Sequence, residues 1–159
     1  MNTLMSKTIK SFFCGLIFST VLGGTLLTAN ALSSSKSNIM RQSANGVSYE
    51  AYSTVTTGKN IYGNYYVTGY TNVEATNVST LRSGSCGVQP RFYSDDHSII
   101  KSGDWTYSSG NATGVGSTVM WIDADSSKAY YAQGSFKIFN GNGYDEYDTW
   151  RSPSLRDFT

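Results

Sequence analysis

The strongest constraint on the fold is a strict alternation of residue types over residues 130–139, followed by the turn sequence Asn140-Gly141-Asn142-Gly143. Successive side chains of a β-strand point to opposite sides, and asparagine and glycine tolerate the positive φ angles of tight turns. Residues 129–153 are therefore predicted to form a long, aromatic-rich β-hairpin. The two faces of its first arm are Tyr130, Ala132, Gly134, Phe136 and Ile138, and Tyr131, Gln133, Ser135, Lys137 and Phe139.

Two registers fit this turn. A two-residue loop of Asn140 and Gly141 would set Phe136 opposite Asp145, a charge against an apolar position. A loop centred on residues 141–142 pairs aromatic with aromatic and cation with anion, namely Phe136 with Tyr147, Lys137 with Glu146 and Phe139 with Tyr144. Each such cross-strand pair contributes roughly 0.2–1 kcal/mol, and a slip of one residue would invert the buried face. The second register is therefore predicted.

Residues 1–31 have the pattern of a secretory signal peptide. Lys7 and Lys10 precede an uncharged apolar run, and Ala29-Asn30-Ala31 matches a signal-peptidase site. The run is shorter than the 20 or so apolar residues of a membrane-spanning helix, and bulky Phe12 and Phe13 disfavour a lipid anchor on Cys14. We expect cleavage after Ala31, export, and no membrane span in the mature chain.

The remaining chain suits one extracellular domain. The 12 basic residues less Lys7 and Lys10 leave 10 against 11 acidic residues, so no basic field exists to hold nucleic acid. Residues 32–46 are polar and aperiodic and are predicted to be a flexible leader. The single remaining cysteine, Cys86, allows no intrachain disulfide. A buried thiol in a monomer is expected, with a dimer linked through Cys86 as the alternative.

Residues 47–159 read as short strands with frequent turn signals and no amphipathic helix. This pattern predicts an all-β domain, a single antiparallel β-sandwich, with an incomplete β-barrel as the alternative. In the longest β-rich run, residues 61–78, the core face is predicted to carry Val67, Gly69, Thr71, Val73 and Ala75, and the polar face Tyr66 and Tyr70. Residues 117–123 contain the apolar run Val119-Met120-Trp121-Ile122 and are predicted to form a central strand buried on both faces, with Trp121 in the core.

The sequence offers little catalytic chemistry. Cys86 and His97, the one histidine, could in principle form a nucleophile pair, but no catalytic signature surrounds them. Asp123, Asp125 and Ser127 have the spacing that begins a calcium loop, and the pattern then fails, so only a looser calcium site there or at Asp145, Glu146 and Asp148 stays open. We expect no enzyme activity, no catalytic residues, no metal and no cofactor.

The aromatic residues are the most informative feature, because all 12 tyrosines and all three tryptophans lie after the signal peptide. Rings on otherwise polar faces can stack on sugar rings or contact proteins at low entropic cost. We expect a secreted, non-enzymatic binding module for polysaccharide or a cell-wall surface, with a bacteriocin-like or toxin-like antagonist as the alternative. The expected ligand-binding residues are Tyr66, Tyr70, Tyr131, Tyr144 and Trp150.

Overall fold

The computed structural model describes residues 30–60, 62–156 and 158, which contain no helix. The predicted signal peptide therefore lies outside the described residues, apart from its last two positions. Within this part of the chain 13 strands are formed: β1 (Asn30–Lys36), β2 (Met40–Ala44), β3 (Val47–Lys59), β4 (Tyr65–Ala75), β5 (Cys86–Gln89), β6 (Arg91–Ser94), β7 (Ile99–Ser102), β8 (Thr106–Tyr107), β9 (Gly114–Gly116), β10 (Met120–Asp123), β11 (Tyr130–Ala132), β12 (Ser135–Phe139) and β13 (Tyr144–Asp148).

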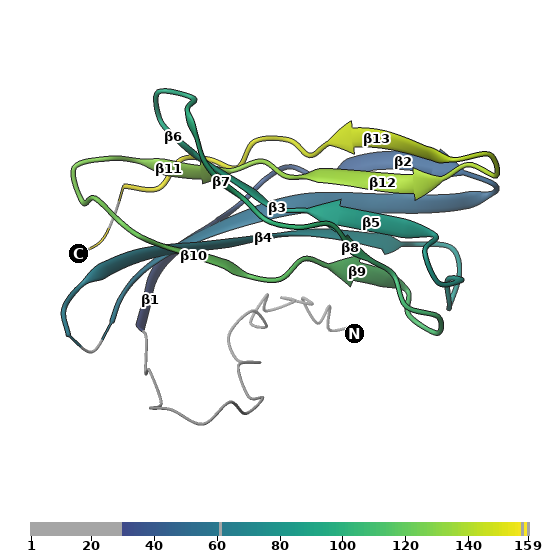
Figure 1. Ribbon diagram of the computed structural model, residues 1–159, viewed down its shortest axis with the longest axis horizontal. Coiled ribbons are helices and arrows are strands. Elements are labelled where there is room, and N and C mark those ends of the chain that lie inside the picture. Colours follow the sequence, from purple (N-terminus) through teal and green to yellow (C-terminus); the bar gives the residue numbers. More distant parts are fainter. Residues whose placement is uncertain (1–29, 61, 157, 159) are drawn as a thin grey trace, which may run out of the picture.

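The strands form three antiparallel sheets, none of which closes on itself within the described residues. Sheet A has the order β1-β3-β4-β10, with β2 also paired to β3 and β9 to β4. Sheet B has the order β13-β12-β5-β8, and sheet C the order β11-β6-β7. The long strands β3 and β4 run along the molecule, with sheet B toward one end and sheet C toward the other (Figure 1). The expected all-β class is confirmed.

Sheets B and C continue one another across a single interruption. Ser135 pairs with Gln89 in sheet B and Ala132 with Phe92 in sheet C, which is the same register on both sides of the gap. Pro90 stands in the gap and has no N–H to give to a ladder. Gly134, which lies opposite Pro90, instead donates its N–H to Ser53 Oγ of β3 at 2.9 Å. The break in the ladder is therefore also a junction with sheet A.

Two apolar clusters join sheet A to the other sheets. The first unites β3 and β4 with sheet B, and its fully buried members include Val73, Cys86, Val88, Phe136 and Ile138. The second unites sheet A with sheet C and includes Val55, Val67, Phe92, Met120, Tyr130 and Phe158. The apolar side chains on one face of each sheet point into the clusters. The other faces of sheets A and B therefore point away from each other.

Buried hydroxyl groups also join sheet A to the hairpin. Ser53 Oγ lies 2.9 Å from Thr71 Oγ1 and 2.8 Å from Thr149 Oγ1. All three side chains are buried to 1% exposure or less. A buried hydroxyl without a partner would cost about 1–3 kcal/mol, and here each hydroxyl bonds another. The network ties β3 and β4 to the residues beside Gly134.

The predicted hairpin register is confirmed. Phe136 pairs with Tyr147, Lys137 with Glu146, and Phe139 with Tyr144. The N–H of Asn140 donates to the carbonyl of Gly143 at 3.0 Å, which closes the turn around residues 141–142. The predicted core face of β4 is also confirmed, since its five residues from Val67 to Ala75 are all buried.

Two local predictions are wrong. Residues 32–46, expected to be a flexible leader, form most of β1 and all of β2, both antiparallel to β3. The backbone of β3 supplies hydrogen bonds to these polar segments, so they need no apolar periodicity of their own. Residues 120–123 form β10, a strand at the end of sheet A paired to β4 alone. Trp121 is consequently 47% exposed rather than in the core.

Candidate binding face on sheet B

Four aromatic rings gather on the face of sheet B that points away from the apolar cluster, and we call them the aromatic platform: Trp105, Tyr107, Phe139 and Tyr144. Trp105 and Tyr107 have ring centroids 6.2 Å apart, and Tyr107 and Tyr144 lie 5.6 Å apart. Tyr144 continues to Phe139 at another 5.6 Å. Tyr107, Phe139 and Tyr144 are 41–43% exposed, so these rings give much of their apolar area to solvent.

Two of the rings lie over the sheet because of what stands opposite them. Tyr107 pairs with Gly87 on β5, and a Cβ atom at Gly87 would come within 2.7 Å of the tyrosine ring. Because Gly87 has no side chain, the Tyr107 ring can lie directly against it. The Lys137 ammonium lies 4.1 Å from the centroid of the Trp105 ring. Since only 22% of the Lys137 side chain is exposed, the indole covers it with a cation–π contact.

The planes of the Trp105 and Tyr107 rings are closer to parallel than those of the Tyr107 and Tyr144 rings. The interplanar angle is 29° between Trp105 and Tyr107 but 57° between Tyr107 and Tyr144. The hydroxyl of Tyr144 donates to the carbonyl of Gly84 at 2.6 Å, which fixes this ring. The platform is thus a pair of adjoining rings inclined by 29°, beside a third ring that a hydrogen bond holds in place.

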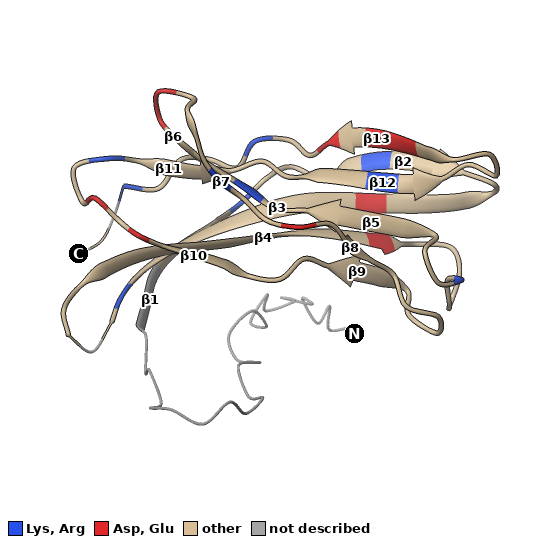
Figure 2. Cartoon of the chain, in the orientation of Figure 1, with Lys and Arg blue, Asp and Glu red and all other residues tan. Residues whose placement is uncertain are grey.

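Charged groups beside the platform are paired. Lys137 Nζ lies 3.2 Å from Glu146 Oε2, and Arg91 Nη1 lies 3.4 Å from Asp148 Oδ1. The acidic residues of β13 run next to the basic residue of β12 (Figure 2). The two carboxylate side chains are 47% and 57% exposed, so they keep free acceptor positions for an incoming hydroxyl. The arrangement combines apolar ring faces with hydrogen-bonding groups of nearly balanced charge.

The structure separates the five residues expected to bind a ligand. Tyr144 belongs to the platform, and Trp150 is 54% exposed just beyond β13. Tyr131 is only 3% exposed and Tyr66 only 6%. The expectation that these two rings face solvent is wrong.

Tyr131 is covered by residues from two other segments. Its ring stacks on Tyr93 at 5.0 Å and 7°, and the Arg151 guanidinium lies 3.9 Å from its centroid. His97 Nδ1 lies 3.1 Å from the tyrosine hydroxyl and 3.3 Å from Arg151 Nη1. Burial raises the pKa of the Tyr131 phenol above its usual value. The alternation of the hairpin places Tyr131 correctly on the outward side, but it does not foresee the arginine that covers it.

Tyr66 and Tyr70 belong to sheet A, on the side away from sheet B. A Cβ atom at Gly58 would lie 2.1 Å from the Tyr66 ring, so this ring lies flat on β3, and it stacks with Trp121 at 6.4 Å. Tyr70 packs edge-on against Tyr52 at 6.2 Å. These rings therefore do not converge with Tyr144.

Sequence reasoning missed Trp105 and Tyr107 as site residues. Their spacing of two, Trp-Thr-Tyr, places both rings on one face of a strand, and this was the available signal. What the sequence could not show is that Tyr107 pairs with Gly87, because the two residues are 20 positions apart and strands β6 and β7 of sheet C lie between their segments.

The structure does not bring Cys86 and His97 into a common cluster. Cys86 is fully buried between sheets A and B, whereas His97 lies in the β6–β7 turn with Tyr131 and Arg151. Burial raises the pKa of the Cys86 thiol, against the opposing effect of a hydrogen bond with Ser108. A thiolate nucleophile needs the reverse shift.

We expect the Cys86 thiol of the folded chain to react with a disulfide reagent at pH 8 at least ~100-fold more slowly than in the unfolded chain, because reaction requires opening of the core. Peptide mapping of the labelled protein, with and without denaturant, measures the two rates at this residue. Equal rates would contradict its placement in the core.

The acidic groups considered for calcium bind their own loops. Asp125 Oδ1 accepts hydrogen bonds from Ser127 Oγ at 2.6 Å and Ser127 N at 2.9 Å, and these bonds lower the pKa of Asp125. Asp145 accepts a bond from Asn140 at 2.8 Å. Among the residues that the structure describes, no three His, Cys, Asp or Glu side chains gather as metal ligands would.

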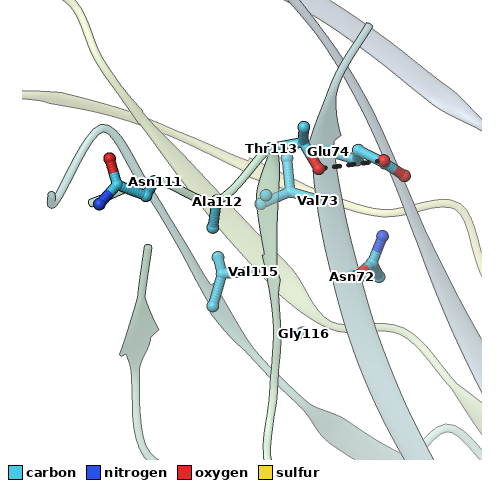
Figure 3. A pocket seen from close by; sticks show the side chains of 9 residues that line it. Asn72, Val73, Glu74, Asn111, Ala112, Thr113, Val115 and Gly116 are labelled. Atoms are coloured by element: carbon cyan, nitrogen blue, oxygen red, sulfur yellow. Dashed lines mark hydrogen bonds between the residues drawn. The ribbon is translucent and has the colours of Figure 1, made fainter. Parts of the chain in front are cut away.

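An open hollow lies elsewhere, beside β4 and β9 and the loop before β9 (Figure 3). Its lining contains one ionisable side chain, Glu74, which accepts a hydrogen bond from Thr113 Oγ1 at 3.3 Å. Glycoside hydrolysis by paired carboxylates needs two acids facing each other across the bond. The hollow does not supply such a pair.

No protein-family model, curated protein or solved structure matches this chain. No helix in the described part of the chain is long and apolar enough to cross a membrane.

Proposed function

We propose that the chain is a secreted, non-enzymatic β-sandwich module that binds polysaccharide or a cell-wall surface through the aromatic platform. The observation that carries the proposal is the adjoining pair of rings, with Tyr107 against Gly87 and Trp105 against the Lys137 ammonium. The apolar side of a sugar ring can stack on such a surface, while neighbouring carboxylates accept hydrogen bonds from its hydroxyls.

Two features support the location and the architecture. The first 31 residues have the charge, apolar run and A-x-A site of a signal peptide, and cleavage after Ala31 would place the new N-terminus within β1. The sandwich is supported by the two apolar clusters, which lie between sheet A and sheets B and C.

Replacing Tyr107 or Tyr144 by alanine should lower the affinity for the bound polysaccharide about tenfold, because the loss of one stacked ring removes on the order of 1.4 kcal/mol. The measurement is a depletion isotherm on insoluble cellulose, chitin, β-1,3-glucan and isolated cell walls. The Trp121→Ala variant is the matched control, since Trp121 is 47% exposed on sheet A; its affinity should stay within about twofold of the parent.

Equal losses for Trp121→Ala and Tyr107→Ala would remove the platform from the proposal. Failure of the parent chain to bind any of these materials, together with growth inhibition of neighbouring strains, would contradict the proposal and favour the secreted antagonist. Thermal unfolding of each variant shows whether a lost affinity reflects a lost fold.

A further inference from the structure

The rings of the platform form a row that runs obliquely over sheet B, along the strand from Trp105 to Tyr107 and then across the sheet to Tyr144. Trp105 and Tyr107 belong to the β8 side, and Tyr144 belongs to β13, the strand at the other end of the sheet order. The Tyr107 and Tyr144 rings meet at 5.6 Å above the two strands between them. The Tyr144 side chain extends over the sheet, and its hydroxyl donates a hydrogen bond to the carbonyl of Gly84. A ligand that uses the whole row must extend from one side of sheet B to the other.

The charges next to this row leave no surplus for a charged ligand. Lys137 is paired with Glu146 and covered by the Trp105 indole, and Arg91 is paired with Asp148 and also bonded by the Gln89 side chain at 2.9 Å. Asp104, exposed immediately before Trp105, adds one negative charge. An anionic polymer would meet these three carboxylates, two cations that carboxylates already engage, and exposed Arg82 in the loop that carries Gly84, so the balance of charge does not favour it.

The same pairs also weaken the case for a cationic polymer. Glu146 and Asp148 already have basic partners, and Asp148 accepts a further hydrogen bond from Ser135 Oγ. A competing cation would have to replace these contacts for a gain that salt screens at exposed positions. Hydroxyl groups, by contrast, can use the exposed carboxylate oxygens without displacing either ion pair.

From these observations, and resting on the proposed function, we infer that the ligand is an uncharged, linear polysaccharide whose chain crosses sheet B from β8 to β13. Ring stacking supplies the contact area, and the carboxylates of Glu146 and Asp148 orient the hydroxyls. Several successive sugar units engage the platform at once, because its rings span the whole width of the sheet.

Polymer pairs that share a backbone, one neutral and one charged, test the inference. The assay uses the full chain as secreted after processing. The three pairs are cellulose and carboxymethyl cellulose, chitin and chitosan, and β-1,3-glucan and its sulfated form. We expect the strongest binding to a neutral member, at least tenfold above its charged partner. That binding should change by less than about twofold between about 20 mM and about 500 mM sodium chloride, since no net charge is neutralised.

Soluble oligosaccharides cut from the preferred polymer give the second measurement. Affinity should rise at least tenfold from the disaccharide to the hexasaccharide, and Tyr144→Ala should remove most of this rise. Preference for a charged polymer with loss of binding in high salt, or affinity independent of length, would overturn the inference while leaving a glycan-binding function in place. Absence of binding to every polymer, neutral or charged, would instead contradict the proposed function itself.

Discussion

Replacement of Gly134 by alanine should destabilise the folded chain by about 3 kcal/mol. A Cβ atom at this position would lie 1.9 Å from Thr71 Oγ1 and 2.6 Å from the backbone carbonyl of Gln89. The carbonyl belongs to the β5–β12 ladder and cannot rotate away, and Thr71 is held in the buried hydroxyl network with Ser53. Overpacking of a closed interior typically costs about 1–3 kcal/mol and more where hydrogen bonds break as well.

Urea unfolding of Gly134→Ala and of Gly143→Ala measures this effect with its control. Gly143 lies in the hairpin turn, where an added Cβ atom would meet no other atom within 4 Å and the backbone has no positive φ. Its replacement should therefore change the free energy of unfolding by less than about 0.5 kcal/mol. A Gly134→Ala chain as stable as the parent would show that the junction between sheet A and the hairpin is looser than described.

Phe136→Ala should cost about 3–5 kcal/mol, the loss expected when a fully buried ring is deleted from a packed core. Phe136 has no exposed surface and stacks on Tyr147 at 5.3 Å within the cluster between sheets A and B. Phe139, three residues further along β12, is 41% exposed, and Phe139→Ala should cost about 1 kcal/mol or less. The comparison uses the same substitution on the same strand.

Chemical denaturation of both variants gives the two free energies. If Phe136→Ala fails to fold, Phe136→Leu keeps most of the volume and should lose less than about 2 kcal/mol. Similar losses at positions 136 and 139 would contradict the assignment of inward and outward faces on β12, and with it the placement of Phe139 on the platform.

The register of the hairpin could be predicted from the sequence because its determinants are local; its predicted extent over residues 129–153 is wrong, because β11 pairs with β6 and only β12 pairs with β13. The Asn-Gly turn and the opposition of Lys137 to Glu146 and Phe136 to Tyr147 select one register without help from the rest of the chain. The inward face of β4 could be predicted for the same reason, since alternation alone sorts its side chains. Local patterns therefore yielded the hairpin register and the inward face of β4.

The remaining features depend on pairings between distant segments. β1 and β2 carry weak patterns and exist because β3 offers both of them a partner. Tyr131 lies on the predicted side of its strand, but Arg151 from the following segment covers it. The platform needs Tyr107 to meet Gly87 and Trp105 to meet Lys137, and neither contact follows from residue types alone. The exposed rings that could be foreseen were thus only part of the site.

We propose that the Trp105–Tyr107 pair on sheet B, and not exposed aromatic surface in general, binds the polysaccharide. The most direct test is the ratio of the dissociation constants of Tyr107→Ala and Trp121→Ala, measured on the same polymer with both chains shown to be folded. We expect a ratio of about ten, with Tyr107→Ala the weaker binder. A ratio near one, or a greater loss at Trp121, would contradict it.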